Sequence, residues 1–470
     1  MGVIPRALCE QAYRAAVQAC SLEPRVRAAF AEQDATTLAP GVYIDHPGVS
    51  VGPLRVEREK AKHVFAVAVG KGALAMARGF ARVKRGIAVA PADDGRPMPP
   101  GWQVVVAAHP HPDERSERAG AAVRALVEDA TDRDIVFALI SGGASALIEQ
   151  PRLPLDELAA TARAVMHAGA PIADLNVVRT ALSELKGGGL ARACAARIVT
   201  LVASDVVGDP LDTIGSGPTI GPWLGPLEST RTAPRVRSIG AIPSIGLAGA
   251  SNATRAGGTG AVGGPGVPVD FGALREARRL AAVEILERHE LAVPAVLRAP
   301  FAADVVTRND RAEVIAPLAS FAKAVAAQLA RIRVIEPAVT DDVAVVAGRV
   351  AALSGWCVAY GEPTLEVPAE HGRGRPRAAP GAAPRARVPQ HRAQRIRRRQ
   401  RRRRRPAAAR VRPLRAAYVD GSTWDAIVAA GIDPAAALAR CDAGTALAAA
   451  GALFAPGPTG INHADVILVG

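Results

Sequence analysis

Short apolar runs alternate with amphipathic segments through the first half of the chain. Residues 64–69 (VFAVAV) predict a strand that ends in a glycine turn and leads into a helix, and residues 134–148 repeat this order. Further strands are predicted within residues 85–91, 102–110 and 197–209, and an amphipathic helix within residues 114–130. Strands that alternate with helices are typical of α/β proteins with a mostly parallel sheet.

The pattern changes twice in the second half. Residues 221–272 are rich in glycine, proline, serine and threonine and show no periodicity, which is atypical inside a compact domain. Periodicity then returns, and we predict a helix followed by a strand in residues 321–337, a helix capped by Thr340, and two strands in residues 355–367. We place a domain boundary near Pro300, which gives domains of residues 1–300 and 301–470.

The formal net charge of +14 is concentrated in one segment. Residues 371–415 hold 18 arginines and no lysine, aspartate or glutamate, which leaves the rest of the chain at −4. The whole chain is 49% hydrophobic and 3% aromatic, as expected of a globular protein with an aliphatic core. The overall charge is therefore no evidence for a nucleic-acid partner.

The five cysteines have neither the spacing of a zinc site nor that of a disulfide framework. Residues 1–20 lack the apolar run of a signal peptide, and no uncharged apolar segment reaches the roughly 20 residues that span a bilayer. We therefore expect a cytoplasmic protein without a membrane-spanning segment.

Two glycine turns follow predicted strands, where ligands bind in open α/β sheets. In VGKGA, Gly70 and Gly72 let the backbone approach an anion, and Lys71 adds a positive charge at a helix start. The second turn offers backbone donors and hydroxyls from Ser141, Gly142, Gly143 and Ser145. Each stretch is also compatible with a simple tight turn, and neither the P-loop motif nor the GxSxG motif of serine hydrolases is present.

Two further stretches carry polar residues in patterns that suit an anionic substrate. Asn176, Arg179, Ser183 and Lys186 recur every three or four residues, which predicts one helix face, and Gly187 and Gly188 follow. A solvated helix face is the alternative.

The stretch SDVVGDPLDTIGSGPT offers carboxylates that suit Mg²⁺ or a base, from Asp205, Asp209 and Asp212, together with Ser216 and Gly217. Turn capping by these aspartates is the alternative. His109 and His111 in HPHPDE favour a rigid loop over a metal site.

Taken in order, VGKGA, HPHPDERS, SGGASAL, NVVRTALSELKGGGLA and SDVVGDPLDTIGSGPT resemble the class II glycerate kinases, the glycerate 2-kinase family with a C-terminal MOFRL domain. The resemblance implies two Rossmann-like α/β domains with mostly parallel sheets and an active-site cleft between them. It implies that ATP phosphorylates D-glycerate to 2-phosphoglycerate with Mg²⁺.

The resemblance also implies roles for individual residues. Lys71 would neutralise the transferred phosphate, and Arg179, Lys186 and the turn of residues 141–145 would surround the nucleotide phosphates and the glycerate carboxylate. Asp205 would bind Mg²⁺ or orient the attacking hydroxyl, with Asp209 as a second metal ligand. The remaining residues implied to bind substrate or nucleotide are Gly70, Gly72, Asn176, Gly187, Gly188, Ser216, Gly217 and Arg373. A homodimer is a further expectation; no membrane partner is expected, and nucleic acid is disfavoured.

The arginine-rich segment departs from the family pattern. After GEPTLEV, which ends at residue 367, the family continues as GRGGRNQELAL and an Asp-Gly loop. This chain begins that pattern with HGRG at residues 371–374 and then has an arginine run until YVDG starts at residue 418. An Asp-Gly pair written GAC GGC after a codon that ends in C is read as CGA CGG, Arg-Arg, when the frame slips by one base. Residues 375–417 are therefore predicted to be a frameshifted translation with compensating insertions or deletions. The alternatives are a basic tract in a damaged, inactive relative that binds polyanions, and, for the whole chain, the hydroxypyruvate reductase activity for which some relatives are named.

Overall fold

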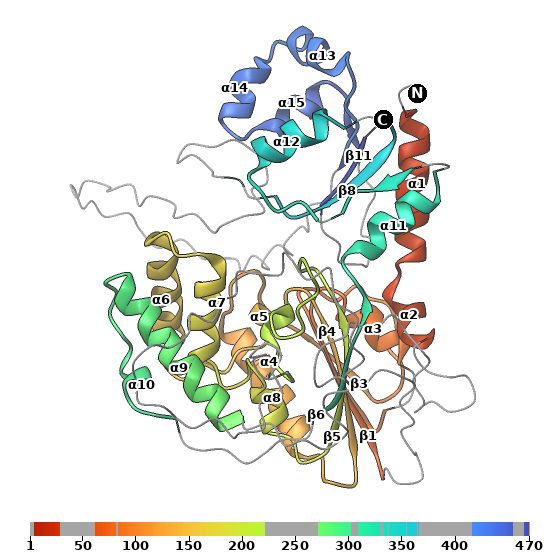
Figure 1. Ribbon diagram of the computed structural model, residues 1–470. Helices are drawn as coiled ribbons and strands as arrows, with labels where there is room; N and C mark the ends of the chain where they lie inside the picture. The colour runs from red at the N-terminus through yellow and green to blue at the C-terminus, as the bar shows by residue number, and fades with distance from the viewer. Residues whose placement is uncertain are drawn as a thin grey trace, which may run out of the picture.

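The computed structural model describes residues 4–28, 62–80, 83–220, 271–301, 309–329, 332–336, 338–353, 355–363, 365, 416–454 and 465–469 (Figure 1). Most of the 221–272 stretch, Arg373 and nearly all of the 375–417 segment lie outside these residues.

A six-stranded sheet forms the core of the first part, and all its strands are parallel. The strand order is β3-β2-β1-β4-β5-β6. The strands are β1 (Val64–Val69), β2 (Arg85–Ala90), β3 (Trp102–Val106), β4 (Ile135–Ser141), β5 (Arg197–Ala203) and β6 (Asn309–Ala316). The prediction of an α/β fold with a mostly parallel sheet is confirmed for this part. The order reverses direction between β1 and β4, which is the switch point of a Rossmann-type sheet.

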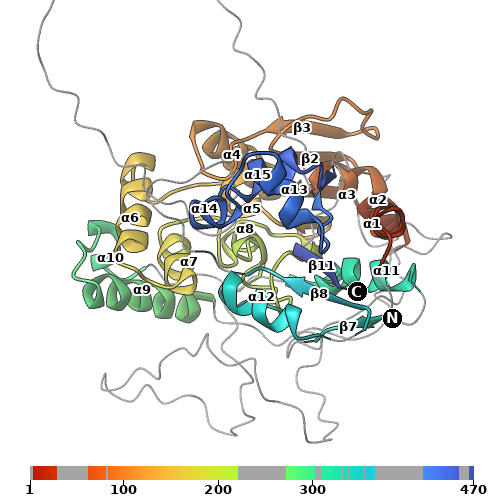
Figure 2. The same ribbon diagram turned by 90° about the horizontal axis from the view of Figure 1, so that it is seen from above.

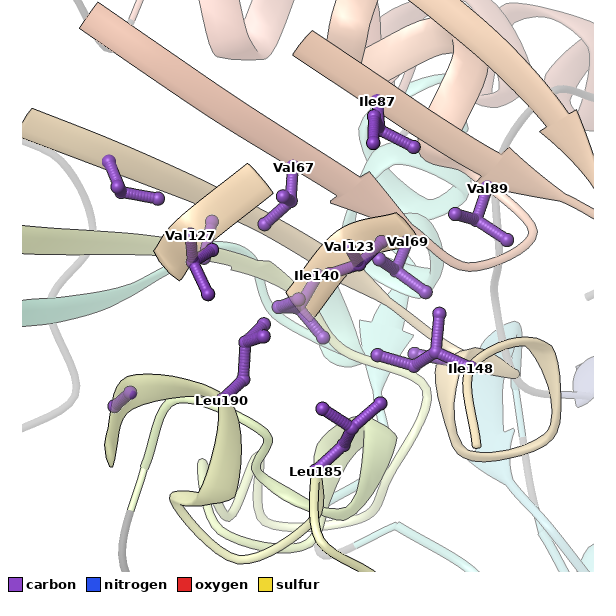
Figure 3. Close-up of a cluster of buried hydrophobic side chains, with 14 of the residues drawn as sticks. Val67, Val69, Ile87, Val89, Val123, Val127, Ile140, Ile148, Leu185 and Leu190 are labelled. Atoms are coloured by element: carbon purple, nitrogen blue, oxygen red, sulfur yellow. The ribbon is translucent and has the colours of Figure 1, made fainter. Parts of the chain in front are cut away.

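Helices cover both faces of this sheet, because the central strands carry apolar side chains on both faces. Val67 and Val69 of β1 pack in one buried cluster with helix α4, while Ala66 and Ala68 pack in another with α2 and α3. Figure 3 shows the first cluster, with Val123 and Val127 of α4 close to Ile140 of β4. The covering helices are α2 (Leu22–Ala28), α3 (Ala73–Gly79), α4 (Glu114–Glu128), α5 (Ala144–Leu147) and α8 (Gly189–Arg192).

Four further helices form a separate group beside the sheet, where α7 and α9 lie side by side (Figures 1 and 2). Leu182, at the end of α7, and Leu286 of α9 are fully buried in the apolar cluster of this group. The helices are α6 (Leu155–His167), α7 (Ile172–Ala181), α9 (Phe271–Arg288) and α10 (Ala295–Arg298).

The second part contains a smaller sheet of order β11-β8-β7 and a two-stranded sheet of β9 and β10. The prediction of a mostly parallel sheet is wrong here, because β11 runs antiparallel to β8 and β7 runs parallel to it. The strands are β7 (Arg333–Val334), β8 (Cys357–Gly361), β9 (Ala416–Ala417), β10 (Leu453–Phe454) and β11 (Asp465–Val469). The helices are α11 (Ala319–Ala327), α12 (Val343–Ala351), α13 (Thr423–Ala429), α14 (Pro434–Ala439) and α15 (Ala443–Ala449).

Two local expectations for this part need correction. Asp342, and not Thr340, caps α12, because its side chain accepts a hydrogen bond from the backbone of Ala344 at 2.8 Å. Within residues 355–367, β8 is the single strand among the described positions.

The chain crosses between the two parts at places that differ from the predicted boundary. β6 pairs with β5, so the first sheet continues beyond Pro300. Helix α1 (Arg6–Ala19) packs on the second part, where its Ala16 shares a buried cluster with Phe321 of α11 and Val358 of β8. Figures 1 and 2 both show α1 beside α11. No described helix is long and apolar enough to cross a membrane.

Candidate active site

The predicted site residues gather at the carboxyl ends of β1, β4 and β5. Val69 of β1 pairs with Ile140 of β4, so the glycine turns that follow these strands are neighbours at the switch point of the sheet. Open α/β sheets bind their ligands at this position. The sheet order therefore brings Lys71, Gly143 and Asp205 to one edge although they lie far apart in the sequence.

The two glycine turns are bonded to each other. The backbone N–H of Lys71 donates to the Gly142 carbonyl at 2.9 Å, and that of Gly72 donates to the Ser141 hydroxyl at 3.0 Å. Gly70 has a φ of 131°, and a Cβ there would lie 2.1 Å from the Ser141 Oγ, so no other residue fits. These donors and the Ser141 hydroxyl thus hold the two turns together, and they are not directed at a ligand.

The Lys71 side chain lies over the second turn, beside His109. A Cβ placed on Gly143 would lie 3.3 Å from Lys71 Cε and 3.0 Å from His109 Nε2. Burial and the positive charge of Lys71 lower the pKa of His109 to about 4, and Asp205 opposes this shift. His109 is therefore a neutral imidazole near an exposed lysine and a carboxylate at neutral pH. The sequence indicated only a rigid loop for this histidine, although it lies close to the end of β3.

Helix α7 ends earlier than predicted. It stops at Ala181, so Ser183 and Lys186 leave the helix face that carries Asn176 and Arg179. Leu182 packs in the cluster of α7 and α9, whereas Leu185 packs against the large sheet, and the chain must turn between them. The predicted four-residue helical stripe is therefore wrong.

Lys186 is buried and paired with Glu149, a residue that the sequence did not single out. Lys186 Nζ donates to Glu149 Oε2, and the Ser183 hydroxyl donates to Glu149 Oε1 at 2.6 Å. Burial lowers the pKa of Lys186, and the Glu149 charge opposes that shift. Because a buried carboxylate already compensates this ammonium group, the geometry does not favour Lys186 as a ligand for substrate.

The remaining predicted glycines and serines form one bonded group. The Ser145 and Ser216 hydroxyls lie 2.6 Å apart. The Gly187 N–H donates to the Ser216 carbonyl at 2.9 Å, and the Gly188 N–H donates to the Gly217 carbonyl at 2.7 Å. The two hydroxyls are thus paired with each other, and the two backbone N–H groups donate to carbonyls of the neighbouring segment.

Two arginines lie near the turn of Lys186 and Gly187. Burial lowers the pKa of Arg179 on α7, opposed by Glu149, and lowers that of Arg278 on α9 to about 10, opposed by Asp212. The sequence did not indicate Arg278, because α9 contains several arginines and the sequence does not show which of them faces the site.

Asp205 and Asp209 differ in their surroundings. Asp209 Oδ1 accepts a hydrogen bond from the Leu318 N–H at 2.9 Å, which ties the loop to the start of α11. Asp205 follows β5 and is half-buried, and no described residue donates a hydrogen bond to it. Within the described ranges no three His, Cys, Asp or Glu side chains gather as a metal site. Since Mg²⁺ commonly takes one or two carboxylates plus substrate phosphates, Asp205 fits such a site and Asp209 fits it less well.

One family model matches the first half of the chain. Residues 8–226 match the family model described as Domain of unknown function (DUF4147). Residues 8–226 are therefore the region of this chain that is similar to this family. All the predicted site residues except Arg373 lie within it.

Curated relatives align with parts of the chain. A glycerate 2-kinase of Pyrococcus horikoshii is 40% identical over 162 residues, which are 33% of this chain and 37% of that protein. A glycerate kinase of Danio rerio is 48% identical over 117 residues (24% and 23%). A D-glycerate 2-kinase of Thermotoga maritima is 37% identical over 163 residues (33% and 39%). The aligned part thus spans well under half the length of these relatives, and it confirms the resemblance that the sequence motifs predict.

Two crystal structures have the same fold. A glycerate kinase from Thermotoga maritima gives a TM-score of 0.63 at 20% identity, covering 98% of each chain. A protein from Pyrococcus horikoshii OT3 gives a TM-score of 0.59 at 21% identity, covering 100% of this chain and 99% of that one. The likeness of fold therefore extends over both parts of the protein.

Proposed function

We propose that the protein is a kinase that transfers the γ-phosphoryl group of ATP to the 2-hydroxyl of D-glycerate. The observation that carries this proposal is the convergence of Lys71, His109 and Asp205 at the switch point of the sheet, within a domain similar to glycerate kinases. Phosphoryl transfer needs mainly positioning and neutralisation of charge, which these groups supply.

The residues have separate roles in this proposal. The glycerate 2-hydroxyl oxygen attacks the γ-phosphorus and loses its proton while the bond to the β,γ-bridging oxygen breaks, so that ADP and a proton are released. Lys71 is exposed, and the long lysine side chain would neutralise the negative charge on the transferred group. Asp205 orients the attacking hydroxyl or, with the phosphates of ATP, holds Mg²⁺. When bound, Mg²⁺ would neutralise charge on the phosphate oxygens.

Other features of the family are proposed for the rest of the chain. We infer that the part after residue 301 corresponds to a MOFRL domain, that Arg373 contributes to the site, and that residues 375–417 result from a frameshift. Resequencing the coding DNA for this segment tests the last point. A hidden frame that reads GRGGRNQE and an Asp-Gly loop supports it, and confirmed arginine codons without such a frame contradict it.

Lys71→Met tests the catalytic assignment. We expect kcat for ATP- and glycerate-dependent ADP release to fall roughly tenfold or more, because the variant loses the cation near the transferred phosphate. Lys84→Met is the control. Lys84 is also exposed, but it precedes β2 at the opposite edge of the sheet, and its Nζ lies 5.5 Å from the Phe65 ring centroid. Equal kcat values for the two variants would show that Lys71 does not take part in the reaction.

A further inference from the structure

One arginine of α9 differs from its neighbours on the same helix. Three of the four arginines of α9 form ion pairs with carboxylates: Arg275 with Glu184, Arg279 with Glu276, and Arg288 with Glu284. Across the part of the chain that the structure describes, no hydrogen bond or ion pair reaches the guanidinium group of Arg278. Arg278 is nevertheless partly buried, so its side chain does not simply extend into water.

Arg278 lies against the turn that closes the candidate site. A Cβ on Gly187 would be 1.7 Å from Arg278 Nη1 and 2.8 Å from Thr180 Cγ2. Gly187 has a φ of 58°, and its N–H bonds to the carbonyl of Ser216, which itself contacts Ser145. The missing side chain at position 187 therefore makes room for the guanidinium group beside the turn that is bonded to the Ser216 backbone.

Arg179 on α7 lies near the same turn, because its charge lowers the pKa of Lys186, the residue before Gly187. It precedes Thr180, which contacts the space at Gly187, and it too has no hydrogen bond or ion pair to a described residue. Burial disfavours the charged form of both arginines, and Asp212 and Glu149 compensate only in part. Two partly desolvated cations without direct partners are stabilised when an anion from solution pairs with them.

We propose that Arg278 and Arg179 together bind the carboxylate group of the hydroxy-acid substrate, and that Gly187 is required for Arg278 to reach it. This inference rests on the proposed kinase function and adds a specificity-determining residue to it. The planar guanidinium group matches a carboxylate with two parallel hydrogen bonds, whereas a lysine offers a point charge that suits the phosphates near Lys71. The nearby negative charge of Asp212 further favours a single carboxylate over a polyphosphate.

Binding measured by calorimetry, with D-glycerate and with ATP in separate titrations, tests this assignment without requiring turnover. We expect Arg278→Met to weaken D-glycerate binding about ten- to hundredfold and to leave ATP binding within about twofold. Arg278→Lys should restore only part of the loss, because it keeps the charge but not the planar fork. Arg288→Met is the matched control on the same helix and should leave both affinities unchanged. Thermal unfolding of each variant verifies that it is folded.

The outcomes separate this inference from the proposed function. Unchanged D-glycerate binding by Arg278→Met, or a loss of ATP binding instead, overturns the carboxylate assignment even if the wild-type protein is an active kinase. A wild-type protein that binds D-glycerate through Arg278 but releases no ADP supports the carboxylate site and contradicts the kinase function. A wild-type protein that binds no D-glycerate overturns the inference outright.

Discussion

Glu149 is a buried carboxylate beside the turn that follows helix α7. It accepts hydrogen bonds from Lys186 Nζ, the Ser183 hydroxyl and the Gln150 N–H, and its charge opposes the pKa shift of Arg179. These contacts fix the turn between α7 and the glycines at 187 and 188. Glu149 thus acts through its neighbours and positions the site without touching the proposed substrate.

Replacing Glu149 by glutamine should destabilise the protein strongly. The buried ammonium group of Lys186 loses its counter-charge, and we expect the free energy of unfolding to fall by about 3–5 kcal/mol. Urea unfolding measures this change, with Glu157→Gln at an exposed position of α6 as control. The double variant Glu149→Gln/Lys186→Met should recover part of the loss. A single variant as stable as the control would show that the ion pair is not important for stability.

His109 makes stability depend on pH. Its pKa is about 4 in the folded protein and about 6.5 in the unfolded chain, so the unfolded state binds a proton more readily. Stability from this group is complete above pH 6.5 and is lost progressively as the pH falls towards 4. Between pH 7 and pH 5 we expect a loss of about 1–2 kcal/mol in metal-free buffer that is absent in His109→Gln. Identical pH dependence in both proteins would contradict a desolvated, neutral His109.

At the scale of elements, an element can be predicted from the sequence when its pattern of apolar residues reflects how it is buried. The β1 and β4 strands were predicted because they are continuous apolar runs, as strands covered on both faces must be. β6 was missed because half of its sequence, NDRAEVIA, is polar, as an edge strand allows. The end of α7 was missed because Leu182 and Leu185 join two different clusters, which periodicity alone cannot reveal.

Helix α1 is stabilised by its contacts with the second part of the molecule. Phe321 of α11 is buried and makes an edge contact with Tyr13 of α1 at 5.2 Å between ring centroids. Phe321→Ala should cost about 3–5 kcal/mol. Hydrogen exchange should show lost protection in α1 and β8 and retained protection in β1 and β4. Phe137→Ala in β4 is the control and should weaken the large sheet first. Loss of protection in the large sheet alone after Phe321→Ala would contradict this assignment.

At the scale of the whole molecule, the sequence predicts which segments lie together, but it does not predict the hydrogen bonds and ion pairs between them. Lys71, Ser141 and Asp205 could be brought together in advance because the carboxyl ends of parallel strands share one edge. The pairing of Lys186 with Glu149, and the approach of Arg278 to Gly187, depend on how α7 and α9 pack, which local sequence does not encode. The same limit applies to α1, whose amphipathic pattern does not specify the part on which it docks.

The central claim, phosphorylation of D-glycerate at its 2-hydroxyl, is tested most directly by identifying the product. The purified full chain is incubated with ATP, Mg²⁺ and D-glycerate, and phosphorus NMR follows the reaction. We expect equal amounts of ADP and 2-phosphoglycerate, with no ADP formed when D-glycerate is omitted. The absence of glycerate-dependent ADP release, or a product phosphorylated on the 3-hydroxyl, would contradict the proposed function.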